Sequence, residues 1–231
     1  MRSTFHDDLD HTRDQLVEMT RLAGSAMARA TTALLDADLA VAESVIAADE
    51  RLDEIQRGLD ELALDLLARQ QPVATDLRTI VTSMRMSADL ERMGDLARHV
   101  AKVARRRYPE SAVPATLRGT VLRMGQVAER IVADAGSVIA SQDVAGAVRL
   151  EQDDDEMDRL HRAIFAELLG GSWEHGMEAA VDITLIGRYY ERFADHAVSV
   201  ARRVVYLVTG EWHEAYDPSA PDGVRAVTPS A

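Results

Sequence analysis

A seven-residue segment occurs twice in this chain, a hundred residues apart. Glu91-Arg92-Met93-Gly94-Asp95-Leu96-Ala97 returns as Glu191-Arg192-Phe193-Ala194-Asp195-His196-Ala197. Each copy carries two carboxylates four residues apart, which on a helix project from one face and repel each other. The apolar residues around both copies recur at steps of three and four, the period of an amphipathic helix. The repeat therefore predicts two similar helical units, each with an acidic motif.

Length and composition support an all-α chain. At 231 residues and 47% hydrophobic, the chain can bury the core of one large domain or two small ones, and the repeat favours two. Only six prolines occur, at positions 72, 109, 114, 218, 221 and 229, so long segments are free of this helix breaker. We predict two similar three-helix bundles in tandem.

Apolar periodicity and breaking residues predict six helices. In the first half they run from about Thr4 to Leu35, from a cap at Asp36 or Asp38 to about Arg69, and from about Thr75 to Arg107. In the second half they run from about Leu117 to beyond Val138, from a cap at Asp143 to Gly170-Gly171, and from Ser172 toward Trp212. The predicted domains are a first bundle over 1–109, a second over 110–211, and a mobile C-terminal tail over 212–231.

Charge and cysteine content exclude several classes of function. A formal net charge of −13 argues against nucleic acid or an anionic membrane surface as a general partner, because both need clustered Lys and Arg. The chain has no Cys, which excludes disulfides, thiolate metal sites and cysteine nucleophiles. It has neither an N-terminal signal-peptide core nor a stretch approaching the ~20 apolar residues of a membrane span. We expect a cytoplasmic protein without direct membrane insertion.

A second acidic pair precedes each repeated motif. Asp49 and Asp53 lie in the second predicted helix, and Asp154 and Asp158 in the fifth. In an antiparallel hairpin that turns at Pro72, Asp49 lies level with Asp95, and Asp53 with Glu91. A turn near Glu174 likewise sets Asp154 level with Asp195, and Asp158 with Glu191. The sequence therefore predicts four carboxylates at one level of each hairpin.

The repulsion between four neighbouring carboxylates has to be relieved. One pair at ~4 Å repels by ~4 kcal/mol at an effective dielectric near 20. Protonation relieves this repulsion in part, and cations relieve it more fully. An all-oxygen site suits Fe(III), Mn(II), Mg(II) or Ca(II), with Zn(II) also possible.

We expect Arg92 and Arg192 to offset the negative charge of neighbouring acids. His99 and His161 could add a nitrogen ligand, whereas His196 points about 100° away from Asp195. The alternative is that these acids lie on solvated faces and bind nothing.

Up to about residue 210 the chain resembles the PhoU family, accessory proteins of phosphate-specific transport. The family signature is an acidic residue followed four positions later by Asp, repeated in two three-helix bundles. It occurs here as Glu91-Arg92-Met93-Gly94-Asp95 and Glu191-Arg192-Phe193-Ala194-Asp195, with partner motifs Asp49-Glu50-Arg51-Leu52-Asp53 and Asp154-Asp155-Glu156-Met157-Asp158.

The resemblance implies a regulator and not an enzyme. It implies negative regulation of phosphate uptake and of the phosphate-starvation response, with the ATPase subunit of a phosphate ABC transporter and a sensor histidine kinase as partners. It also implies a homodimer and multinuclear metal clusters of iron, with zinc, manganese or magnesium as alternatives. The ligands carried over are Asp49, Asp53, Glu91 and Asp95 for one site, and Asp154, Asp158, Glu191 and Asp195 for the other. Two departures argue against assuming equal occupancy of the sites: Leu96 stands where the second copy has His196, and five fewer residues separate the motifs in the second half.

Two other functions compete with this one. A carboxylate-bridged di-iron oxidoreductase would also place acids inside a helical bundle, but it requires Glu-x-x-His motifs, and neither Glu91 nor Glu191 begins one. A metal-free helical scaffold would use the acids only for repulsion or docking. Chelation separates this scaffold from a metal-binding regulator, because it leaves the stability of the scaffold unchanged.

Overall fold

A computed structural model describes residues 2–171 and 173–211 of the chain. Within these ranges every regular element is a helix, so the predicted all-α fold class is confirmed. The first half contains α1 (Arg2–Asp36), α2 (Leu39–Ala48), α3 (Glu50–Gln70) and α4 (Thr75–Arg107). The second half contains the short 3-10 helix η1 (Ala115–Leu117), α5 (Arg118–Ser141), α6 (Val144–Leu169) and α7 (Gly176–Thr209).

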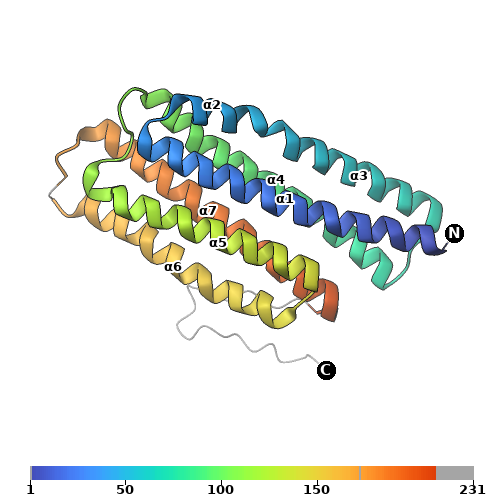
Figure 1. Cartoon of the computed structure of the whole chain (residues 1–231). Coiled ribbons are helices and arrows are strands. Elements are labelled where there is room, and N and C mark those ends of the chain that lie inside the picture. Colours follow the sequence, from blue (N-terminus) through green and yellow to red (C-terminus); the bar gives the residue numbers. More distant parts are fainter. Residues whose placement is uncertain (1, 172, 212–231) are drawn as a thin grey trace.

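The helices form an elongated bundle in which the two halves lie side by side (Figure 1). The turn between α3 and α4 lies at the same end as the N-terminus, and the connection between α6 and α7 lies at the opposite end (Figure 1). Each half is a three-helix bundle, with α2 and α3 together forming the middle rod of the first. The predicted tandem of two similar bundles is confirmed.

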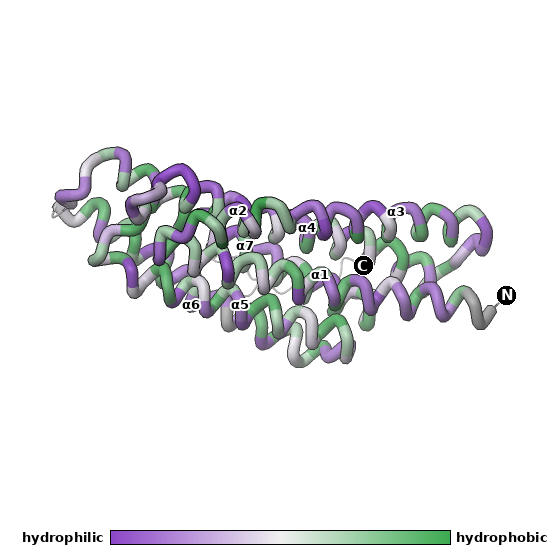
Figure 2. The backbone as a smooth tube through the Cα atoms, turned by 45° about the horizontal axis from the view of Figure 1, so that its top comes forward, coloured by the Kyte–Doolittle hydropathy of each residue, from purple (hydrophilic) through white to green (hydrophobic). Residues whose placement is uncertain are grey.

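The two halves share one hydrophobic core. α1 packs along α5, and α4 packs along α7. Hydrophobic and hydrophilic residues alternate along the helices (Figure 2). Buried residues of each helix from α1 to α7 join a single apolar cluster. Glycines permit the close crossing of α1 and α5, because a Cβ at Gly125 would lie 2.6 Å from Thr31 and one at Gly136 would lie 2.5 Å from Thr20.

Most helices begin and end at the capping and helix-breaking residues predicted from the sequence. Asp38 and Asp143 cap α2 and α6, accepting hydrogen bonds from the backbone N–H groups of Val41 and Ala145 at 3.0 Å each. α4 spans the predicted residues. The chain limits proposed for the two domains stay a prediction, and the predicted tail over 212–231 lies outside the described residues.

Two boundaries differ from the prediction. The second helix is interrupted at Asp49, where a tightened turn with a hydrogen bond from the Leu52 N–H to the Asp49 carbonyl separates α2 from α3. The last helix begins at Gly176 and not at Ser172, which itself lies outside the described residues. Gly171 and Gly176 both have positive φ, +77° and +80°, and these left-handed residues keep the connecting segment out of the helix.

Polar contacts also join α4 to α7. Near one end of the pair, the buried Asp182 accepts hydrogen bonds from Arg106 and Arg107. Farther along, Asp89 accepts hydrogen bonds from Ser199 and Arg203 and pairs with His196 Nδ1 at 3.0 Å. Between residues 2 and 211, omitting 172, no helix has both the length and the hydropathy needed to cross a membrane.

Candidate functional site

The first acidic group consists of Asp49, Asp53, Glu91 and Asp95, and the structure brings Asp49 and Asp95 onto one cation. Arg98, one turn after Asp95 on α4, forms an ion pair with Asp49, with Nη1 2.9 Å from Oδ2, and donates a hydrogen bond from Nη2 to Asp95 Oδ1. Arg92 Nη1 also lies 2.6 Å from Asp95 Oδ2. Asp49 and Asp95 are each 9% exposed, so the deepest acids of the group are the ones that receive an arginine.

A glycine permits this close approach between the helices. A Cβ at Gly94 would overlap Leu52 Cδ1 and lie 3.3 Å from Asp49 Oδ1. The buried Leu52 fixes the start of α3 against α4. The motif's Gly94 therefore positions Asp49 beside Asp95, as well as continuing the helix.

The carboxylates of the first group raise one another's pKa values. Burial raises the pKa of Asp49, and the neighbouring Asp95 and Asp53 add to the rise while Arg98 opposes it. Burial also raises the pKa of Glu91, with further contributions from Asp95, Asp53 and Asp49. The four acids of the first half thus lie close enough to influence one another.

The second acidic group consists of Asp154, Asp158, Glu191 and Asp195. Burial raises the pKa of Asp154 to about 7, and Asp195, Asp158 and Glu191 each add to the rise. Burial likewise raises the pKa of Glu191, despite its ion pair with Arg188. Arg188 was not singled out by the sequence, where Arg192 was expected to offset the acids. Asp195 is exposed, unlike its counterpart Asp95.

The three candidate histidines have different surroundings. His99 stacks on Tyr189 of α7 with ring centroids 5.2 Å apart, and His196 is held by Asp89, so both side chains contribute to the packing of α4 on α7. His161 packs on α7, where a Cβ at Gly187 would lie 3.1 Å from its ring. The Nε2 atom of His161 is buried and has no hydrogen-bond partner within the described part of the chain.

These donor sets suit a hard cation, although they do not yet enclose one. Among residues 2–171 and 173–211, no three Asp, Glu or His side chains converge closely enough to hold a metal ion as they stand. Each group nevertheless supplies carboxylate oxygens alone, the ligands that hard cations prefer. The second group also has the unpartnered His161 Nε2 beside it, a borderline nitrogen donor. Both acidic groups thus fit a cation that draws their side chains together.

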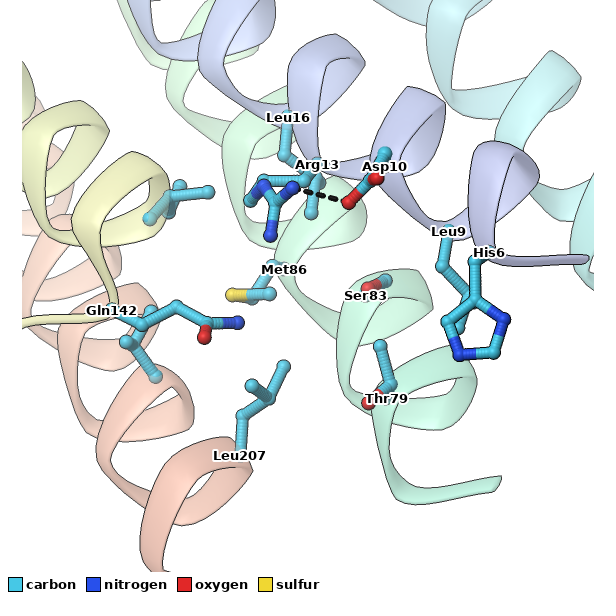
Figure 3. A pocket seen from close by; sticks show the side chains of 12 residues that line it. His6, Leu9, Asp10, Arg13, Leu16, Thr79, Ser83, Met86, Gln142 and Leu207 are labelled. Carbon is cyan, nitrogen blue, oxygen red and sulfur yellow. Dashed lines mark hydrogen bonds and ion pairs between the residues drawn. The ribbon is translucent and has the colours of Figure 1, made fainter. Parts of the chain in front are cut away.

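A separate cavity of about 170 Å³ lies between α1, α4, α7 and the turn after α5 (Figure 3). Leu16, Met86 and Leu207 form its apolar wall, and Arg13, which pairs with Asp10, lies at its polar side (Figure 3). Its lining comes from segments far apart in the sequence, so no local motif indicated it. With Asp10 as its one lining carboxylate, the cavity does not resemble the acidic groups.

Comparisons with known proteins agree with this architecture. A family model described as the PhoU domain matches residues 16–104 and 121–204. The chain is 50% identical over 210 residues to the phosphate-specific transport system accessory protein PhoU homolog 2 of Mycobacterium tuberculosis, covering 91% of this chain and 99% of the relative. It is 32% identical over 212 residues to a PhoU homolog of Rhizobium meliloti, covering 90% and 88%.

Two crystal structures show the same fold. PhoU from Pseudomonas aeruginosa superposes with a TM-score of 0.83 at 32% identity and covers 90% of this chain and 100% of its own. The phosphate transport system regulatory protein PhoU from Streptococcus pneumoniae superposes with a TM-score of 0.82 at 25% identity, covering 91% and 100%.

Proposed function

The chain belongs to the PhoU family, and from this we propose that it is a metal-binding negative regulator of phosphate uptake and of the phosphate-starvation response. The relatives are named as accessory and regulatory proteins of phosphate transport, and this chain is likewise an accessory protein and not an enzyme. Within that role, binding of a metal and coupling to other proteins are the parts that require testing.

One observation supports metal binding above the others: each half gathers four carboxylates from two helices into one electrostatic group. We assign one metal cluster to Asp49, Asp53, Glu91 and Asp95. We assign the other to Asp154, Asp158, Glu191 and Asp195. Iron is the first candidate, with zinc, manganese or magnesium as alternatives. A bound cation supplies charge neutralisation and cross-links α3 to α4 and α6 to α7.

We propose the ATPase subunit of a phosphate ABC transporter and a sensor histidine kinase as partners, with the protein acting in the cytoplasm. Exposed apolar side chains support a role in protein contacts, and they occur at equivalent positions of the two repeats. On α3 and α4 these are Leu64 at 62%, Leu77 at 40% and Val81 at 38% exposure. On α6 and α7 they are Leu169 at 82%, Met177 at 80% and Val181 at 50%. A homodimer would also use such surfaces.

Metal analysis of the purified protein tests the proposal. The wild-type chain is compared with a variant in which Glu91, Asp95, Glu191 and Asp195 are changed to Ala, after both are offered iron, manganese, magnesium and zinc. We expect stoichiometric metal in the wild type and little in the variant, measured by inductively coupled plasma mass spectrometry. Absence of stoichiometric metal from both proteins would reject the metal-binding part of the proposal.

A metal-free scaffold is the second candidate, and Arg98 is the observation that favours it, because this side chain already neutralises two acids of the first group. A chelator separates the two candidates. It lowers the unfolding temperature of a metal-binding regulator and leaves that of a scaffold unchanged.

A further inference from the structure

The two acidic groups differ in one partly buried charge. Aligning Glu91 and Asp95 with Glu191 and Asp195 places Arg98 opposite Val198. Arg98 is 30% exposed at its side chain, and Val198 is 6% exposed. At equivalent points of two similar helices, the first repeat thus has a guanidinium that contacts the acidic group, and the second has an aliphatic side chain buried in the core.

Arg98 occupies a bridging position in the first group. Its guanidinium contacts Asp49 from the junction of α2 and α3, and Asp95 from α4, so it spans the two helices that carry the acids. The contact with Asp95 is a charge-assisted hydrogen bond, which is stronger than a neutral one, and the contact with Asp49 is an ion pair. A metal ion that enters between Asp49 and Asp95 has to displace this side chain.

Among the described residues, no cation joins two acids of the second group. Arg188 pairs with Glu191, and the exposed Arg162 lies 3.6 Å from Asp158. Arg202 of α7 pairs with Glu151 of α6 at 2.8 Å, but Glu151 is not one of the four acids. None of these three arginines joins two acids of the second group as Arg98 joins Asp49 and Asp95, and within residues 2–171 and 173–211 Asp154 forms no ion pair. The unpartnered His161 Nε2 lies beside this group, whereas the first half has Gln56 at the corresponding position.

We propose that Arg98 serves as a built-in cation of the first acidic group, so that metal loads at the second group, Asp154, Asp158, Glu191 and Asp195, in preference to the first. This inference rests on the proposed metal-binding function and specifies its site. In this arrangement Arg98 neutralises the first group until a metal displaces it, whereas the second group depends on a metal ion for its neutralisation.

Site-resolved metal counting tests the inference. The proteins are the wild type, a first-group variant with Asp49→Asn and Asp95→Asn, a second-group variant with Asp154→Asn and Asp195→Asn, and Arg98→Met. Arg98→Met removes the charge and keeps a long side chain. Each is titrated with Mn(II) and with anaerobic Fe(II), and bound metal is counted after gel filtration. Circular dichroism checks that every variant is folded.

We expect the wild type to lose its metal with the second-group changes and to retain it with the first-group changes. Arg98→Met should raise the affinity of the first group at least tenfold and double the metal count. Combining Arg98→Met with the second-group changes should restore binding to a protein that had lost it.

Three results separate the possible failures. Equal loading of both groups in the wild type, or a metal count unaffected by the second-group changes, overturns the inference while metal binding stands. A metal count unchanged by Arg98→Met in a folded protein assigns the preference to other residues and also overturns it. Absence of metal from every protein rejects the proposed function itself, and the inference with it.

Discussion

Gly94 sets the distance between α3 and α4 at the first acidic group. Because a Cβ at this position would overlap Leu52 Cδ1, we expect Gly94→Ala to lower the free energy of unfolding by about 1 to 3 kcal/mol. Gly58, in the interior of α3, is the matched control. Apart from its chain neighbours and the backbone of its own helix, no atom lies within 4 Å of a Cβ placed there, so Gly58→Ala should raise stability by up to about 1 kcal/mol. Urea unfolding measures both, and equal effects would contradict this account of Gly94.

In protein freed of metal by a chelator, we expect Asp154 to make the free energy of unfolding depend on pH. Its pKa is about 7 in the folded chain and 3.8 as an isolated group, so the folded state holds the proton more tightly. Stability from this group is therefore lost as pH rises from about 4 to 7. We expect Asp154→Asn to be more stable than the wild type at pH 8, by about 1 to 3 kcal/mol, and the difference to shrink toward pH 5.

The control for this prediction is the exposed Asp155, the next residue on α6. Asp155→Asn should change the pH profile of the wild type only slightly, because Asp155 makes the smallest of the contributions that raise the pKa of Asp154. If denaturant unfolding at several pH values gives parallel profiles for the wild type and Asp154→Asn, the proton on Asp154 is not coupled to folding.

The grouping of the acids could be predicted from the sequence, whereas the arginine that neutralises two of them could not. Hairpin spacing alone places Asp49 near Asp95, because the helical rise and the turn at Pro72 fix the level of each residue. Arg98 was missed because its partner Asp49 lies on another helix, and only the packing of α3 on α4 shows that one side chain reaches both. Arg188, by contrast, pairs with Glu191 three residues later on the same helix, and this pair could have been found from the sequence, because residues at i and i+3 are neighbours on a helix.

Between helices, Asp182 is the main polar link from the start of α7 to the end of α4. Its side chain is 4% exposed and contacts Arg106 and Arg107. Asp182→Asn should lower the free energy of unfolding by about 1 to 3 kcal/mol, because it leaves Arg107 without a buried counter-charge. Glu178 contacts the same Arg107 but is 83% exposed. Glu178→Gln should change stability by less than about 0.5 kcal/mol, and a comparable loss in both variants would contradict the role of burial.

Helical period and caps predicted the existence and most limits of the helices, since both signals are local. The break at Asp49 and the start of α7 at Gly176 were not predicted. The first is a single tightened turn within an uninterrupted apolar pattern, and the second depends on two glycines with positive φ. The packing of α1 on α5 and of α4 on α7 also required the structure, because each half alone already has an amphipathic pattern that satisfies a three-helix bundle.

The shared core predicts that the two halves unfold as one cooperative unit despite their internal repeat. Buried residues of α1 and α4 contact those of α5 and α7 in a single apolar cluster, so unfolding one half would expose the core face of the other. Trp173 reports on the second half, since its indole Nε1–H donates to the Gly176 carbonyl at 2.8 Å. In a Trp212→Phe chain, Trp173 is the sole tryptophan.

We expect Trp173 fluorescence and far-ultraviolet circular dichroism to give the same urea midpoint in the Trp212→Phe chain. Tyr190→Phe extends the test across the interface, because the buried Tyr190 hydroxyl lies 2.7 Å from Thr31 Oγ1 and joins α7 to α1. Its loss should cost about 1 kcal/mol and shift both curves equally. If the fluorescence transition came at a lower urea concentration than the loss of about half the circular dichroism signal, each half would unfold alone. In that case the contacts between halves would stabilise an arrangement of two domains, whereas coincident curves make folding of either acidic group depend on the whole chain.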